Sequence, residues 1–209
     1  MTNKTDEAAQ QQSIPSADPA ARLKAIRIGR NMTLAELGKL AGLPVSTLSK
    51  LENGKASFTY DKMVQLTTAL EIDISHLLAD EPASPAMSSP AKLLGRRSIS
   101  RAGEGFSVDS GTYNYLHLAT DILNKNFTPM IGEIKARSVA EFGPFIHHPG
   151  EEFVYVIQGV LELHTEVYSP VILNAGDSIF FDSEMGHAYV SGSDELCKVM
   201  SICWNGDQS

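Results

Sequence analysis

The sequence lacks the features that would place the protein in a membrane or outside the cell. No apolar run reaches the roughly 18–20 residues needed to span a bilayer. The first twenty residues are polar, without the apolar core of a secretory signal. Only two cysteines are present, Cys197 and Cys203, too few for a disulfide framework and spaced unlike any zinc pattern. We therefore expect a cytoplasmic protein with buried thiols and no membrane partner.

Positive charge is also scarce. The chain holds 17 Lys and Arg against 25 Asp and Glu, for a net charge of −8. Residues 21–80 carry eight basic and six acidic side chains, whereas residues 81–209 carry eight and sixteen. An acidic total argues against a protein that coats nucleic acid along its whole surface. It leaves room for one slightly basic module that docks on DNA.

Hydrophobic patterning divides the chain into two parts. Apolar residues have helical spacing up to about residue 80, and short β-branched and aromatic runs follow, separated by Gly, Asn and Asp. The stretch between them is rich in Pro and Ser, a composition typical of a linker. We predict a disordered tail over 1–19, an all-α domain over 20–80, a linker over 81–95 and an all-β sandwich or barrel over 96–209.

The all-α domain is predicted to contain five short helices. Thr33 and Glu36 have the spacing of a capping box at the start of the second helix. Gly42 permits a tight turn before the third helix, as in a helix-turn-helix, whose second helix presents its N-terminal side chains to the DNA major groove. The expected core positions are Leu23, Ile26, Ile28, Leu34, Leu37, Leu40, Leu48, Leu51, Met63, Leu66, Leu70, Ile72, Ile74, Leu77 and Leu78.

The run TLAELGKLAGLPVSTLSKLENGK, residues 33–55, closely resembles the phage-repressor family of helix-turn-helix regulators, often called the xenobiotic-response-element type. The resemblance covers about residues 20–80. It implies a double-stranded DNA operator, usually bound by a homodimer on a near-palindromic site. The alternative is a helical interaction module that binds no DNA. The residues placed at or near the DNA are Leu34, Val45, Ser46, Thr47 and Lys50, with Lys55 as a candidate for a phosphate contact.

The run FIHHPGEEFVYVIQG, residues 145–159, combines histidines and glutamates around a Pro-Gly turn. Because side chains alternate along a strand, His148 faces away from His147, and Glu152 on the next strand can converge with His148. His187 opens a later strand after a loop and supplies a third group. Two histidines and one carboxylate are the ligand set of a facial-triad iron(II) site.

These stretches resemble the paired signature motifs of the cupin family, which are small double-stranded β-helix barrels of the jelly-roll type. Counting back from Gly159 places Glu152 and His148 at ligand positions, whereas Ile146 stands where the first histidine is usual. The resemblance implies a divalent metal (Fe, Mn, Ni or Zn) held by His148, Glu152 and His187, or else a metal-free effector pocket. The candidates for the effector pocket are Tyr113, Tyr115, Met130, Ile134 and Ile146.

The two resemblances together imply a one-component transcriptional regulator whose cupin barrel senses a small molecule. The alternative is an iron(II)-dependent cupin enzyme resembling hydroxypropylphosphonate epoxidase, which joins the same two kinds of domain. A phosphonate substrate needs a cationic pocket, and we therefore expect a regulator rather than an enzyme. The cationic side chains considered for such a pocket are Lys125, Lys135, Arg137 and Lys198.

Overall fold

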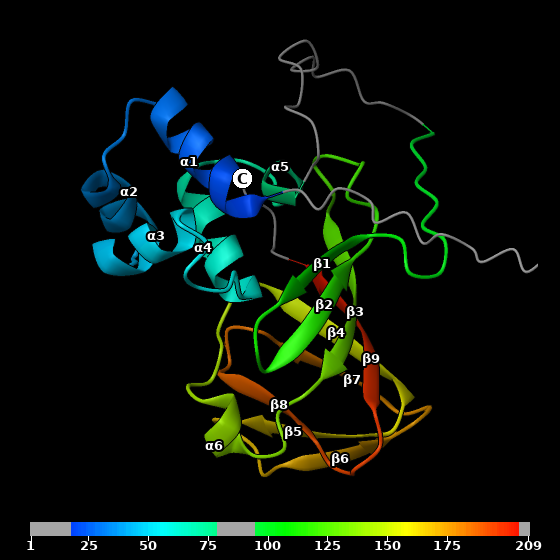
Figure 1. Cartoon of the computed structure of the whole chain (residues 1–209). Coiled ribbons are helices and arrows are strands. Elements are labelled where there is room, and N and C mark those ends of the chain that lie inside the picture. Colours follow the sequence, from blue (N-terminus) through cyan, green and yellow to red (C-terminus); the bar gives the residue numbers. More distant parts are fainter. Residues whose placement is uncertain (1–17, 79–94, 205–209) are drawn as a thin grey trace, which may run out of the picture.

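The computed structural model describes residues 18–78 and 95–204, which form a helical unit followed by a β-barrel (Figure 1). The predicted all-α and all-β order is confirmed. The predicted tail over 1–19 and linker over 81–95 lie almost wholly outside the described residues. Within the described ranges, no helix combines the length and apolar character required to cross a membrane.

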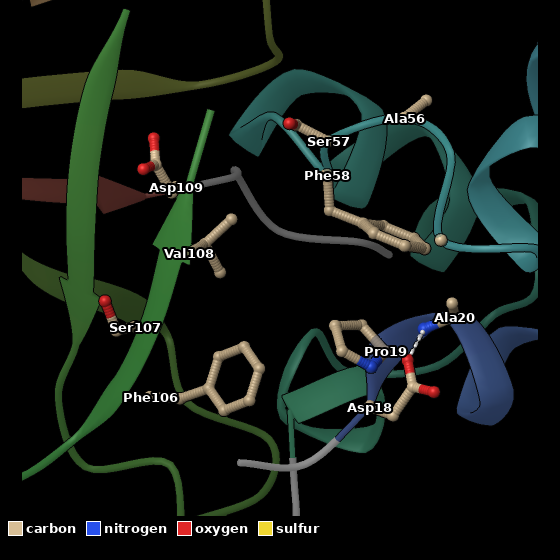
Figure 2. A pocket seen from close by; sticks show the side chains of 11 residues that line it. Asp18, Pro19, Ala20, Ala56, Ser57, Phe58, Phe106, Ser107, Val108 and Asp109 are labelled. Atoms are coloured by element: carbon tan, nitrogen blue, oxygen red, sulfur yellow. Dashed lines mark hydrogen bonds between the residues drawn. The ribbon is translucent and has the colours of Figure 1, made fainter. Parts of the chain in front are cut away.

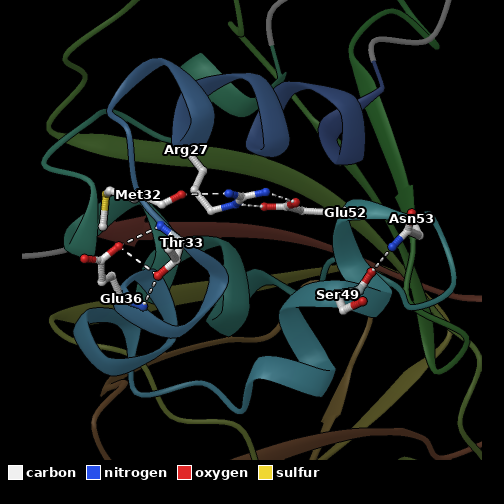
Figure 3. Close-up of polar contacts among 7 residues, drawn as sticks. All are labelled: Arg27, Met32, Thr33, Glu36, Ser49, Glu52 and Asn53. Atoms are coloured by element: carbon white, nitrogen blue, oxygen red, sulfur yellow. Dashed lines mark hydrogen bonds and ion pairs between the residues drawn. The ribbon is translucent and has the colours of Figure 1, made fainter.

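The helical unit has the five helices expected from the sequence. Asp18 caps the first helix by accepting a hydrogen bond from the Ala20 amide, at 2.9 Å. The predicted capping box forms, because Thr33 and Glu36 exchange side chain to backbone hydrogen bonds (Figure 3). The helices are α1 (Pro19–Gly29), α2 (Leu34–Ala41), α3 (Val45–Glu52), α4 (Tyr60–Ala69) and α5 (Ser75–Leu78).

A single apolar core joins these helices. Two expected members of it are wrong, because Ile28 is 54% exposed and Leu40 is 62% exposed. The buried side of α2 is formed by Leu37 and Ala41, and at about 100° per residue Leu40 falls beside that stripe. Ile28 likewise lies off the stripe that Leu23 begins in α1. The fully buried leucines and methionine of the unit are Leu23, Leu37, Leu48, Leu51, Met63, Leu66, Leu70 and Leu77.

The barrel consists of two antiparallel sheets. The six-stranded sheet has the order β1 (Phe106–Asp109), β2 (Tyr113–His117), β3 (Phe127–Ile134), β9 (Cys197–Trp204), β4 (Glu151–Gln158) and β7 (Ser178–Asp182). The three-stranded sheet has the order β6 (Val171–Asn174), β5 (Val160–Thr165) and β8 (His187–Ser191). A short helix, α6 (Val139–Phe142), connects β3 to β4.

Alternation along the strands fills the barrel interior. In β9 every second residue from Cys197 to Cys203 is buried, and β4 buries Glu152, Val154 and Val156. Gly159 ends β4 with φ +75°, and a Cβ there would lie 2.5 Å from the Leu196 carbonyl oxygen. Only glycine therefore permits this turn to approach the start of β9. Pairing of β4 with β9 sets Glu152 opposite Cys203.

Candidate functional site

Helix α3 presents a polar surface to solvent. Leu48 and Leu51 are buried, which leaves Val45, Ser46 and Lys50 exposed on the other side. The remaining predicted DNA-contacting residues lie close by in sequence: Thr47 and Leu34 are half-buried, and Lys55 is exposed just beyond the end of α3.

A tight crossing between α2 and α3 fixes the orientation of this surface. Gly42 ends α2 in the left-handed region with φ 67°, as expected for the turn. Gly38 was not singled out from the sequence, yet a Cβ there would lie 2.7 Å from the Leu43 carbonyl oxygen and 3.3 Å from Leu48. The close approach of the two helices therefore depends on Gly38.

A buried ion pair holds α3 against α1 (Figure 3). The Arg27 guanidinium donates from Nε and Nη2 to the two carboxylate oxygens of Glu52, at 2.6 and 2.8 Å. It also donates from Nη1 to the Met32 carbonyl, at 2.7 Å. The hydrogen bond with Glu52 raises the pKa of Arg27. At the end of α3 the Asn53 amide donates to the Ser49 carbonyl, at 2.6 Å.

In the barrel, His148, Glu152 and His187 lie together and are at most 3% exposed. His148 Nε2 is 3.2 Å from Glu152 Oε2, and His187 Nε2 is 3.6 Å from the same oxygen. His148 comes from the loop before β4, Glu152 from β4 and His187 from the first position of β8. A backbone bridge between Ile146 and His187 ties the two chain segments together.

A fourth donor, Cys203, joins this cluster from β9. The candidate ligand atoms of His148, Glu152 and Cys203 all lie within 4.8 Å of one another. His187 is not part of this group of three. Sequence reasoning treated Cys203 only as a buried thiol. Its place beside Glu152 follows from the register of β4 against β9, which no local spacing in the sequence shows. We name His148, Glu152, His187 and Cys203 the donor cluster.

The donor cluster is electrostatically set for a cation. Burial acts to raise the pKa of Glu152, but the hydrogen bond from His148 and the nearby histidines and Ser201 outweigh it and lower that pKa. The Ser201 hydroxyl donates to Glu152 Oε1. Burial lowers the pKa of His187. A carboxylate is the form of Glu152 that metal ligation requires.

Atoms without hydrogen-bond partners in the cluster also indicate a cation site. His187 Nδ1 donates to the Met185 carbonyl at 2.9 Å, so the neutral ring carries its lone pair on Nε2. That lone pair faces a carboxylate oxygen and, like His148 Nδ1, has no hydrogen-bond partner among the described residues. Two facing lone pairs call for a cation or a proton donor between them. The residues present therefore fit a divalent metal.

The other histidines and the pocket candidates differ in how far they are buried. His147 is half-exposed, with Nε2 3.7 Å from Glu166, and stands apart from the donors as strand alternation predicts. Ile146 is half-buried and offers no ligand atom. His117 is fully buried, and neither of its ring nitrogens has a partner among the described residues. The pocket candidates at most 4% exposed are Tyr113, Tyr115, Met130 and Ile134.

One contributor to the site comes from the helical unit. Tyr60, the first residue of α4, is 2% exposed, and its ring centroid lies 4.9 Å from that of His148 in an edge-on arrangement. The Tyr60 ring centroid also lies 6.3 Å from that of the His117 ring. Sequence reasoning missed Tyr60, because the contact depends on how the two units dock.

Comparison with known families agrees with this division of the chain. Residues 23–77 match the helix-turn-helix family model, and residues 138–203 match the cupin domain family model. The chain joins a helix-turn-helix domain to a cupin domain. No curated protein sequence is a significant match. The resemblances to both families are therefore confirmed, each over its own part of the chain.

Solved structures share this arrangement of domains. An HTH_3 family transcriptional regulator from Vibrio cholerae superposes with a TM-score of 0.57 and 18% identity, over 90% of this chain and 96% of that chain. This likeness shows a common fold. Hydroxypropylphosphonic acid epoxidase from S. wedmorenis, in complex with fosfomycin, gives a TM-score of 0.46 and 20% identity, over 92% and 100% of the two chains. That weaker likeness carries no argument about activity.

Proposed function

We propose that the protein is a one-component transcriptional regulator, which binds a double-stranded DNA operator through α3 and senses a small molecule or metal ion in its cupin barrel. The observation that carries the proposal is the exposed surface of α3, whose orientation is fixed by the Arg27–Glu52 pair. Ser46 and Lys50 on this surface are of the types that read base edges. The two buried cysteines are free thiols, which fits the reducing cytoplasm expected for such a regulator.

In the barrel, we propose that His148, Glu152 and His187 hold a divalent metal, with Cys203 as a further donor. Fe, Mn, Ni and Zn all accept imidazole and carboxylate ligands, and a thiolate favours the softer ions among them. When bound, the metal supplies a positive charge that neutralises the Glu152 carboxylate and anchors an effector. We propose that Tyr113, Tyr115, Met130 and Ile134, all buried, line the effector pocket.

The phosphonate-epoxidase alternative needs a cationic side chain directed at the cluster. Each of the four candidates is engaged elsewhere. Lys135 pairs with Asp109 and Lys198 with Glu133. Lys125 donates to the carbonyls of Ala119 and Ile122, and Arg137 donates to those of Ser193 and Asp194. These partners support a sensor rather than a phosphonate enzyme.

A homodimer is part of the proposal, because a helix-turn-helix protein usually reads two half-sites separated by one helical turn of DNA. Sedimentation of the full chain on its operator fragment tests this directly. Two copies per palindromic fragment are expected, and one copy per fragment would contradict the dimer.

Genomic pull-down with the full chain at low salt, followed by fluorescence anisotropy on the recovered fragments, tests the DNA-binding role. Affinity should fall steeply with salt, since phosphate contacts release counterions. Lys50→Ala and Ser46→Ala should each weaken binding by about 1–3 kcal/mol if each contacts a base edge. Lys24→Ala, on the exposed side of α1, is the matched control and should bind normally. Recovery of no preferred fragment would contradict the proposed function.

A further inference from the structure

The helix-turn-helix domain inserts a side chain into the cupin site. Tyr60 belongs to α4, which packs against α2, yet its ring makes contacts with the rings of His148 and His117 in the barrel. Figure 1 shows α4 on the side of the helical domain that faces the barrel. At 2% exposure, Tyr60 is as buried as the donors themselves. The site that sequence reasoning assigned to one domain is therefore walled by both.

The hydroxyl of Tyr60 reaches the donors. It hydrogen-bonds with Thr128 on β3 and with Cys203 on β9. The Tyr60 hydroxyl therefore lies beside the sulfur that Cys203 contributes to the donor cluster. The ring, meanwhile, covers one side of His148.

The contact between the two domains is not completely packed. A cavity of about 210 Å³ lies beside it, with Pro19 and Phe58 on the helical side and Phe106 and Val108 on the β1 side (Figure 2). The neighbours of Tyr60 are imperfectly satisfied, since Thr59 Oγ1 and one Asp61 carboxylate oxygen are buried without a hydrogen-bond partner among the described residues. Tyr60 is thus a buried anchor close to a cavity between the two domains.

We propose that the donor cluster is a composite site, closed by Tyr60 of the DNA-binding domain, so that a cation held there and the docking of that domain stabilise each other. The inference rests on the proposed function, which identifies the docked domain as the DNA-binding domain. It states how occupancy of the barrel site reaches that domain. Coupling of this kind is reciprocal. If the bound cation favours docking, then docking through Tyr60 must raise the affinity for the cation by the same factor.

Cobalt(II) binding to the full chain tests the composite site without any DNA. Three variants are compared with the wild type: Tyr60→Ala removes ring and hydroxyl, Tyr60→Phe removes only the hydroxyl, and Tyr168→Ala alters a tyrosine that is 71% exposed. The readouts are the Kd for Co(II), the sulfur-to-cobalt absorption band and the rate at which excess chelator extracts the ion. Circular dichroism confirms that each variant is folded.

Tyr60→Ala should weaken Co(II) binding and speed its extraction by about tenfold or more, within the usual range of coupling between sites. Tyr60→Phe should weaken binding and the sulfur band while keeping slow extraction, because the ring still covers His148. Tyr168→Ala should match the wild type. If Tyr60→Ala does not fold, Tyr60→Phe decides the matter alone.

Wild-type affinity and extraction rate in both Tyr60 variants would overturn the composite site. So would a wild-type chain that binds no Co(II), even with operator binding intact. Failure of the wild type to bind any operator would instead contradict the proposed function, and the cobalt comparison would still decide the role of Tyr60.

Discussion

Glu52 at the end of α3 accepts two hydrogen bonds from the guanidinium of Arg27 in α1, and the Glu52 side chain is only 4% exposed. The pair connects the helix proposed to read DNA with the first helix of its own domain. Because both charges are removed from water, each depends on the other.

Glu52→Ala should therefore destabilise the chain by about 3 kcal/mol, near the low end for breaking a buried pair, because Arg27 keeps its bond to the Met32 carbonyl. Chemical denaturation followed by circular dichroism measures the loss. Glu36→Ala, which removes an exposed capping carboxylate, is the control and should destabilise the chain less. Equal losses of unfolding free energy in the two variants would show that the buried pair contributes no more to stability than the exposed cap.

His117 makes stability depend on pH. Burial lowers its pKa to about 3, from an ordinary value near 6.5. A group whose pKa is depressed in the folded state contributes stability above its unfolded pKa and loses it as pH falls toward the folded value. Between about pH 6.5 and 3, His117 should remove up to about 1.4 kcal/mol per pH unit.

Urea unfolding of chelator-treated protein between pH 7.5 and 5 checks this dependence. His117→Phe should flatten the slope, whereas His147→Phe, at a half-exposed histidine outside the cluster, should leave it unchanged. A slope in His117→Phe as steep as in the wild type would assign the pH dependence to other groups.

The two buried cysteines should differ in their effect on metal binding. A metal bound only by the folded chain adds about 2.7 kcal/mol at a hundredfold excess over Kd, so Zn(II) or Co(II) should raise the melting temperature of chelator-treated protein. Cys203→Ser should reduce this rise, while Cys197→Ser, equally buried but outside the donor cluster, should retain it.

His148→Ala and His187→Ala should abolish the metal-induced rise, whereas His147→Ala should leave it intact. Loss of the rise in His147→Ala alone would mean that the strand register through residues 145–153 is wrong.

Local patterns in the sequence were sufficient for much of the fold. The Thr33–Glu36 capping box and the Gly42 turn are encoded within a few residues, and the structure contains both. The period that buries Leu37 was nevertheless extended too far, to the exposed Leu40. A short helix gives few positions from which to fix the edge of its buried stripe.

The barrel site depended more on long-range pairing. Strand alternation predicted opposite directions for His147 and His148, yet both lie in the loop before β4. Cys203 reaches Glu152 only through the pairing of β4 with β9. Tyr60 required still more, because its contact with His148 depends on the docking of two domains. No motif in the sequence carries that information.

The central claim is that the barrel controls the DNA-binding domain, and operator affinity measured with and without metal tests it most directly. Fluorescence anisotropy of a labelled operator, with the wild-type chain loaded with Zn(II) or treated with chelator, should give Kd values that differ by about fivefold or more. Tyr60→Ala should bind the operator with one Kd in both conditions. Identical Kd values for the loaded and chelated wild-type chain, at a metal concentration that raises its melting temperature, would contradict the account.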